Sequence, residues 1–214
     1  MTLLCTSLTL ETPEQILEQT SRCSTYTDAF EIRLDYLKNL CPESVQQIFK
    51  GISRPTVATL RPEKCGGRCV LSDEERSALL EEAACAGASY IDIEVESSFQ
   101  PDLGGTDALR ICSYHNFEKT PDLSSVVQRL LEKSPDIIKI AVNAKTLEDN
   151  MKVFRLLEES KLPMIALCMG EYGKISRILA PKFKSPLMYC SPSKGAEAAP
   201  GQVTAEELAD RYNF

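Results

Sequence analysis

The chain has 214 residues, of which 24 are lysine or arginine and 31 are aspartate or glutamate, so its formal net charge is −7. This acidic balance argues against nucleic acid as a partner, because neutralising phosphates needs a concentrated basic face. No apolar run approaches the length of a membrane span, and the first residues do not resemble a secretory leader. We therefore expect a cytoplasmic protein without a membrane partner, in which locally placed basic residues can still bind a small anion.

The nine cysteines are an odd number, spread through strand-like and helix-like stretches. A small secreted protein held together by disulfides would have a denser arrangement, so we expect reduced thiols. Cys65 and Cys69 are too far apart for a C-x2-C half-site, and His115 is the single histidine. The sequence therefore predicts no metal site.

In chain order, short apolar runs alternate with amphipathic stretches. The strand candidates are residues 3–6, 29–34, 56–60, 90–95, 110–113, 137–142, 164–169 and 187–189. Helices are expected over residues 14–23, 72–86, 123–133 and 147–158, the last capped by Thr146, and another begins at Thr204. Strands that are apolar throughout and alternate with helices indicate a parallel sheet covered by helices. Eight units predict an α/β fold, a closed (β/α)8 TIM barrel with a single domain over residues 1–214; a doubly wound open sheet is the competing architecture.

Unusual polar residues lie in or just after these predicted strands. They are Glu31, Arg33 and Asp35 along the second strand, Arg61 at the end of the third, Asp92 and Glu94 in the fourth, His115 after the fifth and Lys139 in the sixth. Catalytic residues of such barrels lie at the carboxyl ends of the strands. With a period of two, Glu31, Arg33 and Asp35 share one face, and inside a barrel they need partners or a ligand. A structural ion pair explains any one of these residues equally well, but the whole set at one end of a barrel indicates a site.

Lys139 stands in the middle of the apolar run IIKIAV and lies 24 residues after His115. Lysine is rarely buried without a partner, and a neutral amine is a nucleophile toward carbonyl carbon. The pair therefore suggests imine chemistry. The alternative is an edge strand on which Lys139 points to water.

Two loop segments each contain two glycines. Residues 191–202 also contain prolines and small residues, and such a loop at the catalytic face of a barrel can act as a lid; a plain linker is the alternative. The segment with Gly170, Gly173 and Lys174 superficially suggests a phosphate loop. It does not have the G-x-x-x-x-G-K-[ST] spacing, so we predict no nucleotide site.

Five motifs occur together and in order along the chain. They are E-x-R-x-D at Glu31, Arg33 and Asp35; SYHNFEKTP from Ser113 to Pro121; Lys139 in IIKIA; GKISR ending at Arg177; and APGQ ending at Gln202. Each motif is weak alone, but the ordered set is specific and runs from about residue 4 to residue 208. It resembles the type I 3-dehydroquinate dehydratases of the shikimate pathway.

The resemblance implies a lyase that converts 3-dehydroquinate to 3-dehydroshikimate without a metal or an organic cofactor. By this resemblance Lys139 would form a Schiff base with the C3 ketone, and His115 would act as the general acid and base. The substrate-binding residues implied by the family are Arg177 and Gln202 at the carboxylate, Glu31, Arg33 and Arg61 at the ring hydroxyls, and Ser7 in the pocket lining, with Met169 and Tyr189 as apolar and aromatic walls.

Three features depart from the family pattern. Cys65 stands where a glutamate that binds the catalytic histidine is expected, and Glu63 or Glu94 is a candidate to replace it. Ala198 stands where the loop usually has a serine, for which Ser193 is a candidate replacement. The amino-terminal extension that closes the bottom of many such barrels is absent, so we expect a floor that is either open or filled by side chains.

The resemblance also implies a homodimer. Because the last predicted helix stops early and some relatives are fused to shikimate dehydrogenase, we expect the natural polypeptide to continue past Phe214.

Two alternative functions stay open. A class I aldolase can place an imine lysine on a barrel strand, but it usually needs a phosphate cradle after strands seven and eight. A barrel that has lost activity and serves as a binding domain is compatible with the changes at Cys65 and Ala198, although the presence of both Lys139 and His115 argues against it.

Overall fold

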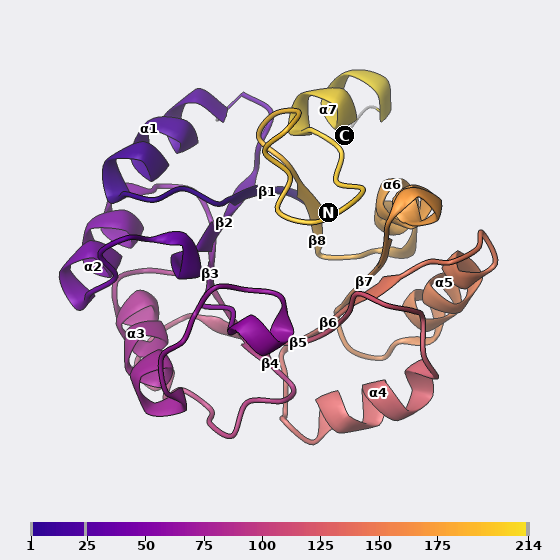
Figure 1. Ribbon diagram of the computed structural model, residues 1–214, viewed down its shortest axis with the longest axis horizontal. Helices are drawn as coiled ribbons and strands as arrows, with labels where there is room; N and C mark the ends of the chain where they lie inside the picture. The colour runs from indigo at the N-terminus through magenta and orange to yellow at the C-terminus, as the bar shows by residue number, and fades with distance from the viewer. Residues whose placement is uncertain (1, 24, 213–214) are drawn as a thin grey trace.

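The computed structural model describes residues 2–23 and 25–212, and the predicted continuation past Phe214 lies outside these residues. Within this part of the chain, eight parallel strands are hydrogen bonded in the order β7-β6-β5-β4-β3-β2-β1-β8. Helices lie outside the ring of strands (Figure 1). The predicted (β/α)8 TIM barrel is confirmed, because β1 to β7 pair in sequence order, β8 pairs with β1, and the order does not reverse as in a doubly wound sheet.

The strands are β1 (Leu3–Leu8), β2 (Ala29–Arg33), β3 (Thr56–Thr59), β4 (Tyr90–Glu94), β5 (Leu109–Asn116), β6 (Ile137–Asn143), β7 (Met164–Met169) and β8 (Leu187–Cys190). The α-helices are α1 (Pro13–Cys23), α2 (Pro42–Gly51), α3 (Asp73–Cys85), α4 (Leu123–Leu131), α5 (Asp149–Glu159), α6 (Lys174–Leu179) and α7 (Ala205–Tyr212). Short 3-10 turns follow β2 (Leu34–Tyr36), β3 (Glu63–Cys65), β7 (Glu171–Gly173) and α6 (Ala180–Phe183).

The barrel is nearly closed rather than closed. Strand β1 pairs with both β2 and β8, but no ladder joins β7 to β8 among the described residues. The prediction of a fully closed sheet is therefore wrong at this seam. Arg177 of α6 and Tyr189 of β8 line a small cavity there.

Lys139 points into the barrel. Its strand, β6, pairs with β5 on one side and β7 on the other, which places Lys139 opposite Ser113 and Ile165. The alternative of an exposed edge strand is wrong, and only 5% of the Lys139 surface is exposed.

Apolar side chains fill the barrel below Lys139. This floor consists of Cys5, Ala29, Val57, Ile111, Ile137, Ile165, Leu187 and Tyr189. Because side chains alternate along a strand, Ile137 and Lys139 share the inner face, with the apolar residue nearer the amino end. The lower half of the barrel is therefore a packed core, and the polar inner residues lie above it toward the carboxyl ends of the strands.

The structure departs from the regular strand–helix alternation at one connection and from one predicted helix start. The connection between β4 and β5 has no helix among the described residues, and its sequence contains Pro101 and the pair Gly104 and Gly105, which disfavour one. Helix α5 begins at Asp149 rather than at residue 147. The carboxylate of Asp149 accepts hydrogen bonds from the backbone N–H groups of Lys145 and Thr146, which holds the preceding residues in a turn.

The predicted starts of α3 and α4 carry the capping hydrogen bonds that their residue types favour. Ser72 accepts a hydrogen bond from the N–H of Glu75, and the Glu75 carboxylate accepts one from the N–H of Ser72, so α3 starts with a capping box. Asp122 caps α4 through the N–H of Ser124. No helix in the described ranges is long and apolar enough to cross a membrane.

Candidate active site

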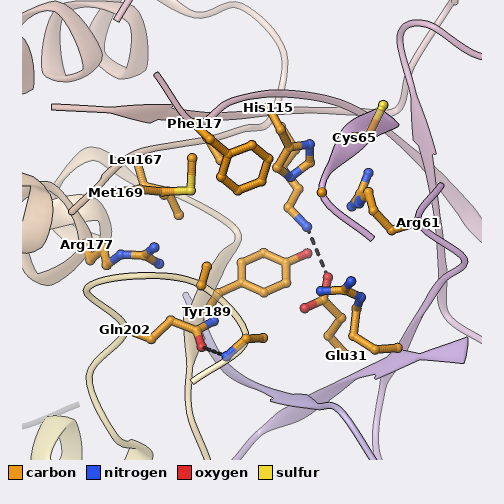
Figure 2. Close-up of a pocket in the computed structure, with 16 residues that line it drawn as sticks. Glu31, Arg61, Cys65, His115, Phe117, Leu167, Met169, Arg177, Tyr189 and Gln202 are labelled. Atoms are coloured by element: carbon orange, nitrogen blue, oxygen red, sulfur yellow. Dashed lines mark hydrogen bonds and ion pairs between the residues drawn. The ribbon is translucent and has the colours of Figure 1, made fainter. Parts of the chain in front are cut away.

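A cavity lies at the carboxyl ends of the strands, above the apolar floor. Residues of β2, β5, β6, β7, β8 and α6, together with the loops after β3, β5 and β8, line it (Figure 2). The predicted site residues that line the cavity are Glu31, Arg33, Arg61, His115, Lys139, Arg177 and Gln202. Ser7 lies beside them, since its hydroxyl donates a 2.6 Å hydrogen bond to the Glu31 carboxylate. The structure thus brings together side chains that are up to 195 positions apart in sequence.

The amine of Lys139 is held between two buried carboxylates. Its Nζ donates to Oδ2 of Asp92 over 2.8 Å and to Oε1 of Glu31 over 3.2 Å. The same Nζ lies 4.0 Å from the centre of the Tyr189 ring, within the range of a cation–π contact. These contacts orient the amine in a pocket where water has little access.

Both carboxylates beside Lys139 stay ionised. Burial alone would raise the pKa of Asp92, but the charges of Arg61 and Lys139 outweigh it and hold that pKa well below its usual range. Burial opposes ionisation of Glu31 in the same way, and Lys139 and Arg33 lower its pKa. The amine therefore lies between two negative charges that hold it in position.

A chain of buried ion pairs leads from this amine to the outside of the barrel. Arg61 contacts Asp92 at 3.1 Å and Glu94 at 2.7 Å. The other oxygen of Glu94 accepts from Arg76 of α3, which also donates to the backbone oxygen of Leu60. The carboxylates raise the pKa of Arg61 despite its burial, so it is permanently charged. This network fixes the wall of the site.

His115 occupies the inner face of β5, next to the cavity. The prediction that it follows the strand is wrong, because β5 extends to Asn116 and includes it. Burial lowers the pKa of His115 well below its ordinary value, and the nearby charges of Arg61 and Lys139 lower it further. Its Nδ1 is buried and has no partner among the described residues. The imidazole is therefore neutral near pH 7, as a general base requires.

Only part of the predicted E-x-R-x-D face points into the barrel. Glu31 and Arg33 are on β2, but Asp35 lies in the 3-10 turn after it. Asp35 accepts two hydrogen bonds from Arg33, at 2.8 and 2.7 Å, and one from the N–H of Arg68. The interpretation of Asp35 as an inner-strand residue is therefore wrong: it anchors Arg33 at the edge of the cavity.

Arg177 lies across the cavity from Glu31, which is the only acidic residue among the described residues that line it. Its Nη2 donates to the backbone oxygen of Pro200 over 3.3 Å, and its Nε has no partner among the described residues. Burial lowers its pKa to about 10. A guanidinium buried without a carboxylate is suited to receive an anionic group from a ligand.

The loop after β8 reaches the cavity through Gln202. Its side-chain oxygen accepts from the N–H of Ala198 over 2.7 Å, and its Nε2 donates to Ser7 over 3.4 Å. The loop also meets the end of β7, where the N–H of Gly170 donates to Pro200. These contacts keep the loop over the cavity.

The change at Cys65 leaves the histidine without an acidic partner in this structure. Cys65 lines the cavity, but its only hydrogen-bond contact among the described residues is a long one of 3.9 Å to Glu96. Glu94 does not replace the expected glutamate, since its oxygens are occupied by Arg61, Arg76 and Ser97. Burial and Glu94 raise the pKa of Cys65 to about 11, so it carries no charge at neutral pH.

The sequence did not predict the contacts that three side chains make in or behind the site. Asp92 was noted as an unusual polar residue, and its alternation with Glu94 along β4 was the available signal. Arg76 lies in a helix among other charged residues, where nothing in the pattern distinguishes it from an exposed arginine. Tyr189 was interpreted only as an aromatic wall.

The arrangement defines a class of enzyme. A lysine amine faces a cavity inside a (β/α)8 barrel, beside a neutral histidine and opposite a guanidinium that forms no ion pair with a described side chain. Such a site can bind an anionic carbonyl compound, form an imine and move protons. Among the described residues, no cluster of side chains could hold a metal ion.

Comparisons with known proteins identify the family. A sequence model of the family described as Type I 3-dehydroquinase matches residues 4–214. The chain therefore belongs to the type I 3-dehydroquinase family, as its motifs predict.

Individual relatives agree with this assignment. The 3-dehydroquinate dehydratase of Desulfotalea psychrophila is 33% identical over 96% of this chain and 94% of its own length. The bifunctional 3-dehydroquinate dehydratase/shikimate dehydrogenase of Arabidopsis thaliana, a chloroplastic protein, is 35% identical over 99% of this chain. This chain spans only 37% of that bifunctional relative.

Solved structures have the same fold. The 3-dehydroquinate dehydratase of Aquifex aeolicus matches with a TM-score of 0.77 and 29% identity, over 99% of this chain and 98% of that one. The enzyme of the same name from Geobacillus kaustophilus matches with a TM-score of 0.87 over 100% of this chain and 90% of that one. At 21% identity, the second match supports the fold alone.

Proposed function

We propose that this protein dehydrates 3-dehydroquinate to 3-dehydroshikimate through a Schiff base on Lys139. The observation that carries the proposal is the Lys139 amine, buried in the cavity and hydrogen bonded to Asp92 and Glu31. Family membership supports the choice of substrate. It argues against a class I aldolase, and the presence of both Lys139 and His115 in one cavity argues against an inactive binding domain.

The proposed reaction begins at the C3 ketone. Lys139 transfers a proton to neutral His115 and attacks C3, and the carbinolamine hydroxyl takes that proton back and leaves as water, which gives an iminium ion. This cation withdraws electrons and acidifies the protons on C2. Neutral His115 then removes one of them, and the resulting enamine expels the C1 hydroxyl, which takes the proton that His115 has gained. Hydrolysis of the imine releases the product.

Arg177 is proposed to hold the substrate carboxylate. Its buried guanidinium supplies paired donors and lacks an acidic partner among the described residues. Gln202 acts at the same end of the ligand from the loop after β8. Glu31, Arg33 and Arg61 line the opposite part of the cavity and are proposed to bind the ring hydroxyls, with Ser7 supporting Glu31.

The test of this function is a direct assay. The product is a conjugated enone, so 3-dehydroquinate should give a rise in ultraviolet absorbance when the protein is added. His115→Ala should lower turnover by about 10²–10⁴, the usual contribution of a general acid or base, while an adduct on Lys139 still forms. Unchanged turnover in His115→Ala excludes the histidine as the base, and no absorbance with the unaltered protein excludes the function.

We also propose that the protein is a cytoplasmic homodimer. The free thiols of all nine cysteines fit a reducing compartment such as the cytoplasm. The family resemblance supports a homodimer, which light scattering after size-exclusion chromatography tests. Fusion to shikimate dehydrogenase occurs in the Arabidopsis relative, and sequencing the full transcript tests it for this chain.

A further inference from the structure

The hydroxyl of Tyr189 is a buried polar group inside the site. Tyr189 lies on β8, only 4% of its surface is exposed, and its Oη has no hydrogen-bond partner among the described residues. Most buried hydroxyls are paired, because an unpaired one lowers stability. A phenylalanine would fill the same space without that cost. The hydroxyl therefore points to a partner that arrives with the ligand.

The position of Tyr189 places it beside the reacting amine. Its ring face lies 4.0 Å from Nζ of Lys139, measured to the ring centre, and the side chain lines the same cavity. Figure 2 shows the ring in the middle of the site with its hydroxyl end toward Glu31. A ketone carbon that bonds to Nζ brings its oxygen into the space that Tyr189 lines.

The chemistry around the hydroxyl suits a proton donor. Burial raises the pKa of Tyr189 well above its usual range, and the negative charge of Glu31 raises it further, so the phenol keeps its proton at neutral pH. The guanidinium groups of Arg33 and Arg61 are already engaged with Asp35, Asp92 and Glu94. Tyr189 thus offers the cavity an uncharged O–H that no neighbouring side chain occupies.

We infer that Tyr189 is a further catalytic residue, whose hydroxyl protonates the ketone oxygen of the substrate as Lys139 attacks the carbonyl carbon. This inference rests on the function proposed above.

The step balances without an outside reagent. The nitrogen lone pair forms the N–C bond while the carbonyl π pair moves to oxygen, which takes the proton of Tyr189. The phenolate takes a proton back from the new ammonium nitrogen, so the tyrosine ends neutral and a carbinolamine remains. Its hydroxyl then leaves as water, using the proton that Lys139 gave to His115, and the nitrogen lone pair forms the C=N bond of the iminium ion.

Two substitutions separate the hydroxyl from the ring. Tyr189→Phe removes the O–H and keeps the aromatic face under the nitrogen, which stabilises a cation on it. Tyr189→Leu removes both. Tyr172→Phe is the matched control, because Tyr172 is half exposed and does not line the cavity.

The experiment follows imine formation directly. Each variant is mixed with 3-dehydroquinate, quenched with borohydride after increasing times, and analysed by intact mass for the adduct on Lys139. For Tyr189→Phe we expect the adduct to form about 10²-fold more slowly than in the unaltered protein, with an unchanged or higher melting temperature. Tyr189→Leu should be slower still, and Tyr172→Phe should match the unaltered protein.

Adduct formation in Tyr189→Phe within about twofold of the unaltered rate overturns the inference and leaves the proposed function intact, since about 10²-fold is expected of a proton donor. Slow adduct formation with a lowered melting temperature also overturns it, because the hydroxyl would then be structural. No adduct in the unaltered protein overturns both this inference and the proposed function.

Discussion

Lys139 and Asp92 form a buried ion pair in which Nζ lies 2.8 Å from Oδ2. The same Asp92 oxygen lies 3.1 Å from Arg61, and the other accepts a 2.6 Å hydrogen bond from Ser113. One carboxylate therefore positions the amine and ties it to the arginine wall of the site. This relationship makes Asp92 as important to the geometry of the site as the lysine itself.

Replacing Asp92 with asparagine should destabilise the protein. Lys139 and Arg61 would lose a shared buried counter-charge, and breaking a buried pair from one side costs about 3–5 kcal/mol. We expect Asp92→Asn to lower the free energy of unfolding by about 3 kcal/mol in a denaturant titration. Asp107 is exposed, so Asp107→Asn is the control and should change the free energy of unfolding by less than about 0.5 kcal/mol. Equal effects of the two variants would contradict the central role of Asp92.

The buried His115 should make the protein sensitive to mild acid. Its pKa is lowered in the folded state, whereas in the unfolded chain it is about 6.5, so below that pH the unfolded state binds a proton that the folded state does not. The stability contribution is complete above pH 6.5 and is lost as the pH falls toward the folded pKa. The contribution of His115 to the free energy of unfolding changes by at most about 1.4 kcal/mol per pH unit.

The measurement compares unfolding free energies of the unaltered protein and His115→Asn from pH 7 to pH 5. Carboxylates titrate in both proteins, so their effect cancels in the difference. The unaltered protein should lose more stability than the variant below pH 6.5. Parallel curves would show that His115 titrates as it does in the unfolded chain.

Removing Arg177 should weaken binding without weakening the fold. Its guanidinium is buried, and no ion pair joins it to another described side chain, so methionine at this position removes a desolvated charge. A charge-assisted hydrogen bond contributes about 1.5–3 kcal/mol, which corresponds to about a 10–100-fold rise in KM.

Steady-state kinetics and thermal unfolding of Arg177→Met test this expectation. The exposed Arg155→Met serves as the charge-matched control, with KM unchanged. A structural role for Arg177 would instead lower the melting temperature and leave KM within about twofold, well short of the change expected for a charge-assisted bond.

Restoring a glutamate at Cys65 should raise the pKa of His115. Both side chains line the cavity, and Nδ1 of the histidine is without a described partner. A carboxylate near the imidazole favours its charged form, so the acid limb of the kcat/KM profile should move up by about one pH unit. Cys85→Glu adds the same charge at an exposed cysteine and should leave the profile in place. Identical profiles for the two variants would place position 65 out of reach of the histidine.

Much of the fold follows from local patterns in the sequence. Each predicted strand lies on a strand of the barrel, because runs such as that around Lys139 are apolar on both faces, as a parallel sheet requires. The regular strand–helix alternation did not predict that the connection between β4 and β5 lacks a helix, although Gly104 and Gly105 disfavour one there. The open seam between β7 and β8 depends on how the strands pair in space, which no local pattern reports.

The site, too, could be predicted only in part from the sequence. The motifs predicted which polar side chains line one cavity, since strand ends of a barrel converge. The ion pairs that these side chains form could not be predicted. Asp35 lies after the end of β2 and binds Arg33, and Glu94 binds Arg61 and Arg76 rather than His115. These pairings depend on distances between strands and helices that are remote in sequence.

The most direct test of the proposed Schiff-base mechanism is covalent trapping of the substrate on Lys139. The protein is incubated with 3-dehydroquinate, reduced with borohydride and analysed by intact mass and peptide mapping, with Lys139→Ala and the exposed Lys152→Ala treated in parallel. We predict one adduct per chain, located at Lys139, present in Lys152→Ala and absent in Lys139→Ala. Turnover of 3-dehydroquinate without any adduct at Lys139 would contradict the Schiff-base mechanism.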